Sequence, residues 1–91
     1  MRPVIVVSRD AINRNSPVVV IVPLTNAENI KRLYPNDVLI PTGVSGLAVD
    51  SVALTGQVRV ISKKRLLRWR GMVSVDSMRA VERALRITLD L

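Results

Sequence analysis

Histidine and cysteine are both absent from this chain of 91 residues, and their absence narrows the chemistry that it can perform. Without thiols there are no disulfides and no thiolate zinc sites, which fits a reducing cytoplasm. Without imidazole, the chain has no side chain of the type that most often carries acid–base catalysis at neutral pH. Any reaction must therefore rely on guanidinium, hydroxyl, amide or carboxyl groups.

Aromatic residues and long hydrophobic runs are also scarce. Phenylalanine is absent and Trp69 and Tyr34 are the only aromatic residues, so the core must be aliphatic. No apolar run approaches the roughly 18 residues that span a bilayer, and the N-terminus lacks a signal-peptide pattern, so we expect a cytoplasmic protein with no membrane segment. Apolar residues still make up 48% of the chain, which predicts a globular fold. We expect residues 1–91 to form a single domain.

Acidic residues are few compared with basic ones. Fourteen Lys and Arg face seven Asp and Glu, which gives a net charge of +7. The densest basic cluster contains no acid and comprises Arg59, Lys63, Lys64, Arg65, Arg68 and Arg70. Such a field attracts polyanions, and the neighbouring Trp69 can stack on a base, so we favour nucleic acid as the partner. An acidic protein partner or a solvated face would fit the same pattern.

Two β-branched runs near the N-terminus predict a pair of buried strands. They cover residues 3–8 and 17–25, and both are too short for ordinary helices. Residues 9–16 form a polar connection between them, with room for one helical turn. Arg2 opens the first run and Thr25 closes the second, so pairing of the two runs makes both side chains candidates for a site on a rigid sheet.

The middle of the chain predicts further strands. Residues 26–36 are irregular, residues 37–41 predict a short strand, and residues 42–46 form a turn with two glycines. Residues 51–61 predict one long strand, with Gly56 marking a bulge or a bend. We therefore expect at least four strands, mostly antiparallel.

The C-terminal segment changes to a helical period. Ser74 is a suitable N-cap, and Asp76 lies in the first turn, where the helix dipole favours an anion. Helical spacing predicts an apolar face made of Met78, Val81, Leu85 and Leu89, opposite a polar face made of Arg79, Glu82, Arg83 and Arg86. The residues thus predict a mainly β fold with a C-terminal helix, and favour a small SH3-like barrel over a sandwich.

Several motifs, in this order and spacing, resemble the MazF/PemK toxins of bacterial toxin–antitoxin systems. They are Arg-Pro-Val-Ile-Val-Val-Ser at residues 2–8, Asn-Arg-x-Ser-Pro at 13–17, the strand ending in Thr25, Asp-Ser-Val-Ala-Leu at 50–54, Gln-Val-Arg at 57–59 and Ala-Leu-Arg-Ile-Thr-Leu at 84–89. The resemblance runs through nearly the whole chain. It implies an SH3-like small barrel of the MazF/PemK/CcdB type that forms a homodimer.

The resemblance also implies an activity and its partners. Members of this family are endoribonucleases that cut single-stranded RNA, including mRNA, at short sequences without a metal or cofactor, and thereby inhibit translation and growth. A cognate antitoxin silences them, and DNA is contacted only through the antitoxin. By position, the resemblance implies a catalytic pair, Arg2 and Thr25, and a set of RNA-binding residues, Asn13, Arg14, Gln57 and Arg59.

The chemistry of this pair predicts a slow enzyme. Arginine is a poor general base but a good clamp for the charge that builds on a pentacoordinate phosphorane, and Thr25 can orient a phosphate oxygen. Neither a guanidinium nor an aliphatic hydroxyl has an ordinary pKa near neutrality that would let it transfer protons. The rate enhancement of roughly 10²–10⁴-fold that general acid–base catalysis typically provides is therefore largely missing. Taken without the resemblance, Arg2 would be read as a terminal charge and Thr25 as a strand-end residue.

The chain departs from the family pattern at two places. Relatives carry a first strand and a loop before the Arg-Pro motif, whereas this sequence starts at Met1, so we expect an unpaired sheet edge and a weaker grip on substrate. A longer natural protein, or a toxin-like dimer that binds antitoxin but cuts poorly, is favoured over a natural short form. Gly56 also replaces an acidic residue, which weakens base recognition there. A gyrase poison of the same fold is a further alternative.

Overall fold

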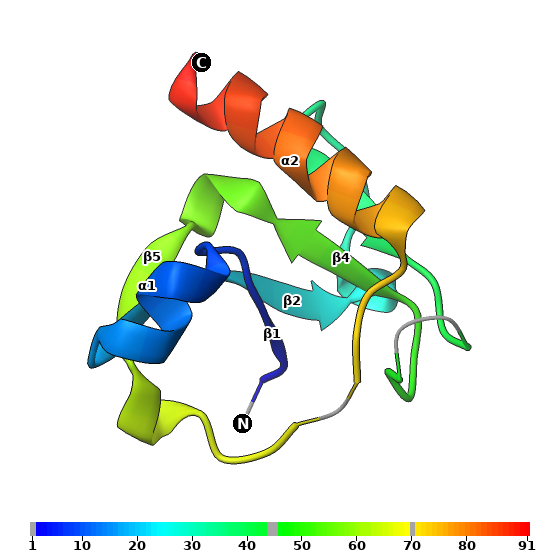
Figure 1. Ribbon diagram of the computed structural model, residues 1–91. Helices are drawn as coiled ribbons and strands as arrows, with labels where there is room; N and C mark the ends of the chain where they lie inside the picture. The colour runs from blue at the N-terminus through cyan, green and yellow to red at the C-terminus, as the bar shows by residue number, and fades with distance from the viewer. Residues whose placement is uncertain (1, 44–45, 70) are drawn as a thin grey trace.

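The computed structural model describes residues 2–43, 46–69 and 71–91. Part of the expected glycine turn (Val44 and Ser45) and one member of the basic cluster (Arg70) lie outside the described residues. Within the described ranges, five strands and two α-helices follow one another (Figure 1): β1 (Val4–Val6), α1 (Asp10–Asn15), β2 (Val18–Asn26), β3 (Asp37–Ile40), β4 (Ser51–Leu54), β5 (Arg59–Ser62) and α2 (Val75–Leu89). Three short 3-10 helices join them: η1 (Ala27–Asn29), η2 (Thr55–Gln57) and η3 (Lys63–Arg65).

The strands form one antiparallel sheet centred on β2. Its path runs β1-β2-β4-β3, and β5 also pairs with β2. Ile21 pairs with Val6 on β1 and with Arg59 on β5, so these two strands lie on opposite edges of β2. The expectation of at least four antiparallel strands followed by a C-terminal helix is confirmed.

The prediction of one long strand over residues 51–61 is wrong. β4 and β5 both pair with β2, but η2 separates them and adds three residues that have no counterpart on β2. Leu24 donates its N–H to the carbonyl of Pro3, which directly precedes β1, so the nitrogen of Pro23 faces the opposite edge, where β4 and β5 lie. Because proline has no N–H to donate, the ladder is interrupted at this point.

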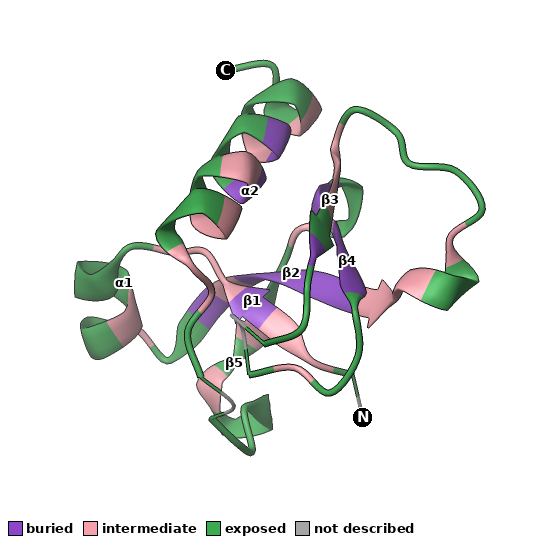
Figure 2. Cartoon of the chain, turned by 90° about the vertical axis from the view of Figure 1, so that its right-hand side faces the viewer, coloured by how far each residue is buried: buried purple, intermediate pink, exposed green. Residues whose placement is uncertain are grey.

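The core is aliphatic, as the sequence predicts, and lies between the sheet and α2 (Figure 2). Its buried cluster consists of Ile5, Val22, Leu24, Ile40, Ala53 and Val81. The N-terminus of α2 is capped as expected, since the hydroxyl of Ser74 accepts a hydrogen bond of 3.1 Å from the N–H of Ser77. Met78 and Leu85 pack against the cluster, so most of the predicted apolar face of the helix is confirmed.

Leu89 is the exception on the predicted apolar face, because its side chain is 51% exposed. Seven residues make almost two helical turns, so Thr88 aligns with Val81 while Leu89 is rotated away. Thr88 accepts a hydrogen bond of 3.1 Å from the amide of Asn36, and its hydroxyl oxygen lies 2.9 Å from that of Thr55. A polar cluster therefore replaces the expected apolar contact in the last turn of α2.

Candidate active site

Arg2 precedes β1 at the open end of the β1–β2 pair, where β2 carries Thr25. Val4 is paired with Pro23, and the N–H of Leu24 donates to the carbonyl of Pro3 over 3.1 Å. Continuing this register by one residue sets Arg2 directly opposite Thr25. The Pro3 position is a hydrogen-bonded one, so the next position is non-hydrogen-bonded, where opposed side chains approach most closely.

The hydroxyl of Thr25 is held in place and keeps its donor. Thr25 is half-buried, and its backbone pairs with Val52 on β4. Its Oγ1 accepts a hydrogen bond of 3.2 Å from the side-chain amide of Asn29 in η1. This contact uses one lone pair of the hydroxyl, and the O–H remains able to donate to an anionic oxygen.

The Arg2 side chain is exposed, and its charge is uncompensated by its neighbours. Within residues 2–43, 46–69 and 71–91, its guanidinium forms no hydrogen bond and no ion pair. A guanidinium offers a planar fork of N–H donors that fits two oxygens of a phosphate. A free fork opposite a hydroxyl donor is therefore suited to holding a phosphodiester and to stabilising negative charge on it.

Gln57 and Arg59 are not brought to this pair. Arg59 is opposite Ile21, and the strand rise of about 3.3 Å per residue places that position roughly 13 Å along β2 from Thr25. Gln57 ends η2, between β4 and β5. Both side chains are exposed, so they face solvent at a different part of the sheet.

Asn13 and Arg14 also lie away from the pair, in α1. This helix connects β1 to β2 at the closed end of the hairpin, whereas Arg2 and Thr25 lie at its open end. The amide of Asn13 donates to the carbonyl of Ser8 over 2.8 Å and accepts from the hydroxyl of Ser8. Its polar atoms thus fix the β1–α1 connection, while Arg14 is exposed in the last turn of the helix.

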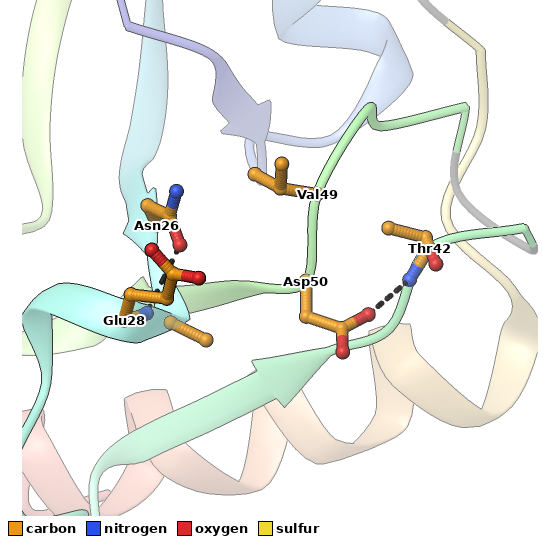
Figure 3. Close-up of a pocket in the computed structure, with 6 residues that line it drawn as sticks. Asn26, Glu28, Thr42, Val49 and Asp50 are labelled. Carbon is orange, nitrogen blue, oxygen red and sulfur yellow. Dashed lines mark hydrogen bonds between the residues drawn. The ribbon is translucent and has the colours of Figure 1, made fainter.

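A pocket next to Thr25 was missed by the sequence reasoning (Figure 3). It has a volume of about 330 Å³ and is lined by Asn26, Ala27, Glu28, Thr42, Val49 and Asp50. Asn26 follows Thr25 on β2, and the N–H of Ala27 donates to the carbonyl of Asp50 over 2.8 Å. The motif at residues 50–54 includes Asp50 from this pocket. No sequence pattern, however, indicated that the start of this motif contacts the end of β2.

The polar groups of this pocket are positioned by local hydrogen bonds. Oδ1 of Asn26 accepts from the N–H of Glu28 at 3.0 Å, and Oδ1 of Asp50 accepts from the N–H of Thr42 at 2.8 Å. Within the described residues, the amide nitrogen of Asn26 and the second oxygen of Asp50 form no hydrogen bond. Two carboxylates repel a phosphate, whereas an oxygen acceptor and an amide donor that line one pocket can match the edge of a nucleic-acid base.

Among the described residues, no three His, Cys, Asp or Glu side chains gather closely enough to hold a metal ion. No helix in the same part of the chain has the length and apolar character needed to cross a membrane.

The fold and this site define a family. The model of the PemK-like, MazF-like toxin of type II toxin–antitoxin systems matches residues 1–89, and the chain belongs to this family. Endoribonuclease MazF9 of Mycobacterium tuberculosis (strain ATCC 25618 / H37Rv) is 39% identical over 95 residues, which cover 99% of this chain and 79% of the relative. The chain is therefore a homologue of a MazF-family endoribonuclease.

Solved structures agree with this assignment. An endoribonuclease in complex with its cognate antitoxin from a mycobacterial species matches with a TM-score of 0.87 and 27% identity, over 99% of this chain and 82% of that one. The Mycobacterium tuberculosis toxin MazF-mt6 matches with a TM-score of 0.86 and 24% identity, over 99% and 87%, and so supports the fold alone. The expected barrel-like fold of the MazF type is confirmed.

Proposed function

We propose that this protein is a metal-independent, sequence-specific endoribonuclease that cleaves single-stranded RNA, including mRNA, and so inhibits translation and growth. Arg2 and Thr25 form the catalytic pair. The observation that supports the proposal is the β1–β2 register, because its continuation past Pro3 and Leu24 brings the backbone of Arg2 next to that of Thr25. The homology to an endoribonuclease supports RNA as the substrate.

The proposed reaction is an internal transfer at phosphorus. The 2′-oxygen of the ribose forms a bond to the phosphorus atom, and the bond from phosphorus to the 5′-oxygen of the next nucleotide breaks. The 2′-hydroxyl proton goes to water and the leaving 5′-oxygen takes a proton from water, which gives a 2′,3′-cyclic phosphate and a 5′-hydroxyl. Arg2 stabilises the charge on the non-bridging oxygens, and Thr25 orients one of them.

The pocket beside Thr25 receives a base next to the cleaved bond in this proposal. The free oxygen of Asp50 accepts from an exocyclic amino group, and the amide nitrogen of Asn26 donates to a ring nitrogen or carbonyl oxygen. Glu28 supplies a second acceptor at the rim, where its side chain is exposed. Bases that carry an amino group are thus preferred over uracil at this position.

The remaining features of the proposal concern assembly. We place the protein in the cytoplasm, with residues 1–91 acting as one domain in a homodimer. Its partner is a cognate antitoxin. In the toxin–antitoxin complex, the antitoxin contacts DNA and the toxin does not. The net charge of +7 supports an acidic protein partner, and the match to a toxin bound to its antitoxin supports the same kind of complex. Asn13, Arg14, Gln57 and Arg59 are proposed to guide the flanking RNA rather than the cleaved bond.

RNA cleavage in EDTA tests the proposal. A long RNA is incubated with the wild-type protein and with Arg2→Ala, and the new 5′ ends are mapped. We expect discrete cuts that decrease at least about 100-fold in Arg2→Ala, because the charge on the phosphorane is no longer stabilised. Arg83→Ala, which removes an exposed arginine on α2, is the matched control and should cut normally.

Two outcomes would replace the proposal. If wild type and Arg2→Ala are equally inert while the protein still binds an antitoxin, the chain is a binding module without catalytic activity. If RNA stays intact and the same preparation blocks DNA supercoiling by gyrase, the protein is a gyrase poison of the same fold.

A further inference from the structure

The segment from Lys63 to Trp69 combines exposed apolar and basic side chains, which the proposed catalytic pair does not use. Trp69 is 77% exposed and Leu67 is 67% exposed. Lys64, Arg65 and Arg68 are exposed between and beside them. We call residues 63–69 the Trp69 segment. So much apolar surface next to cations indicates a site that meets a partner.

The start of the Trp69 segment is fixed to the sheet. The N–H of Lys63 donates to the carbonyl of Pro17 over 2.9 Å, and the N–H of Leu66 donates to the carbonyl of Lys63 over 3.0 Å. The hydroxyl of Ser62 caps η3 by accepting from the N–H of Lys64 at 3.3 Å. The backbone that carries Lys64 and Arg65 is therefore positioned before any ligand arrives.

The charge around the segment is of one sign. The sequence contains no acid between Asp50 and Asp76. Within the described residues, Lys64, Arg65 and Arg68 form no ion pair. Uncompensated cations of this density favour a polyanion over a neutral partner, and the attraction weakens as salt is added.

We propose that the Trp69 segment binds single-stranded RNA outside the cleaved bond, with the indole of Trp69 stacked on a base and Lys64, Arg65 and Arg68 on phosphates. An aromatic ring between cations is the arrangement that holds single strands without reading their sequence. This inference rests on the proposed function for the identity of the polyanion, and it adds a second contact that holds the flanking strand.

Intrinsic fluorescence tests the stacking directly, because Trp69 is the only tryptophan. The probe is a single-stranded oligonucleotide of mixed sequence with 2′-O-methyl groups, which lacks the attacking hydroxyl and stays intact. We expect it to quench the Trp69 emission. A dye-labelled copy should bind Trp69→Ala about 5- to 100-fold more weakly, which is the range for the loss of one stacked base. Leu33→Ala, which removes an exposed apolar side chain outside the Trp69 segment, should change binding less than about twofold.

The salt dependence of binding tests the phosphate contacts. The double variant Lys64→Gln with Arg65→Gln should lower the slope of log affinity against log salt by about 1.4, since each lost contact to a single strand accounts for about 0.7. Lys31→Gln with Arg32→Gln removes the same charge from another exposed loop and should leave the slope nearly unchanged.

The inference and the proposed function fail in different ways. If RNA is cut but the intact oligonucleotide neither quenches Trp69 nor distinguishes Trp69→Ala from Leu33→Ala, the Trp69 segment does not bind RNA and the nuclease proposal stands. If RNA is not cut but the quench and the loss in Trp69→Ala are found, the segment binds RNA and the catalytic assignment is wrong. Quenching by a poly-glutamate peptide or by anionic vesicles, and not by the oligonucleotide, would overturn the inference in favour of that partner.

Discussion

The hydroxyl oxygens of Thr55 and Thr88 lie 2.9 Å apart, which joins η2 to the last turn of α2. Thr55 also donates to the carbonyl of Asn36, and its side chain is fully buried. Asn36 in turn donates its amide to Thr88. The three residues therefore fasten the helix to the break between β4 and β5, at the place where the sequence predicts an apolar contact.

Replacing Thr55 by valine should destabilise the protein. The substitution keeps the shape but leaves the carbonyl of the half-buried Asn36 without its donor, at a cost of about 1–3 kcal/mol. Thr88→Val should cost less, because Thr55 can still donate to Asn36. Urea unfolding measures both variants, and Thr42→Val on the exposed loop is the control. Equal stability of all three variants would contradict the role given to this cluster.

Thr25→Val and Thr25→Ser should separate the hydroxyl from the methyl group at the catalytic position. Valine keeps the β-branched shape that suits the strand, so the fold is retained while the donor to the phosphate is lost. We expect single-turnover cleavage to fall about 10²–10³-fold in Thr25→Val and far less in Thr25→Ser. A Thr25→Val enzyme of normal rate would remove Thr25 from the proposed mechanism.

The pH profile of cleavage should show no inflection near the ordinary pKa of histidine, about 6.5. The chain has no histidine, and the proposed pair stabilises charge instead of moving protons. Single-turnover rates between about pH 5.5 and 8 check this expectation, with unfolding monitored in parallel. A sharp bell centred near neutrality would require an acid–base pair that the mechanism lacks.

Asp50→Asn should alter which base is accepted beside the cleaved bond. The asparagine oxygen can still accept from the N–H of Thr42, so the loop is kept, while the second acceptor becomes a donor. We expect the preference for amino-bearing bases to fall by about 5- to 150-fold, the usual range for one good base contact. Mapping cut sites in a random RNA pool measures the change. Glu82→Gln on α2 is the control.

Sequence patterns predicted the elements that depend on local chemistry. The β-branched runs identified β1 and β2, and the helical period with Ser74 identified α2. Gly56 marked a bulge or a bend in the predicted long strand, and it lies in η2, but the full separation into β4 and β5 was not predicted. Part of its cause lies in the partner strand, because Pro23 lacks the N–H that a continuous ladder requires. Leu89 was wrongly predicted to be buried, because the helical spacing of apolar residues does not show how far along the helix its packing against the sheet extends.

The candidate site was only partly predictable for a similar reason. Arg2 and Thr25 were proposed from two sequence motifs and from the expected pairing of two consecutive strands. Both features can be recognised in the sequence itself. The pocket required the start of β4 to meet the end of β2, a contact between segments that no periodicity reveals. The resemblance implied an RNA contact for Asn13, and the sequence could not show that its amide also hydrogen-bonds to Ser8.

The two side chains of the proposed catalytic pair differ in their backbone support. Thr25 belongs to β2, which pairs with three strands, whereas Arg2 precedes β1 and is tied to the sheet through the carbonyl of the next residue, Pro3. Segments outside a strand ladder open locally at a smaller free energy than global unfolding requires. Warming should therefore abolish the proposed nuclease activity by loosening the segment before Val4, reversibly and well below the melting temperature of the barrel.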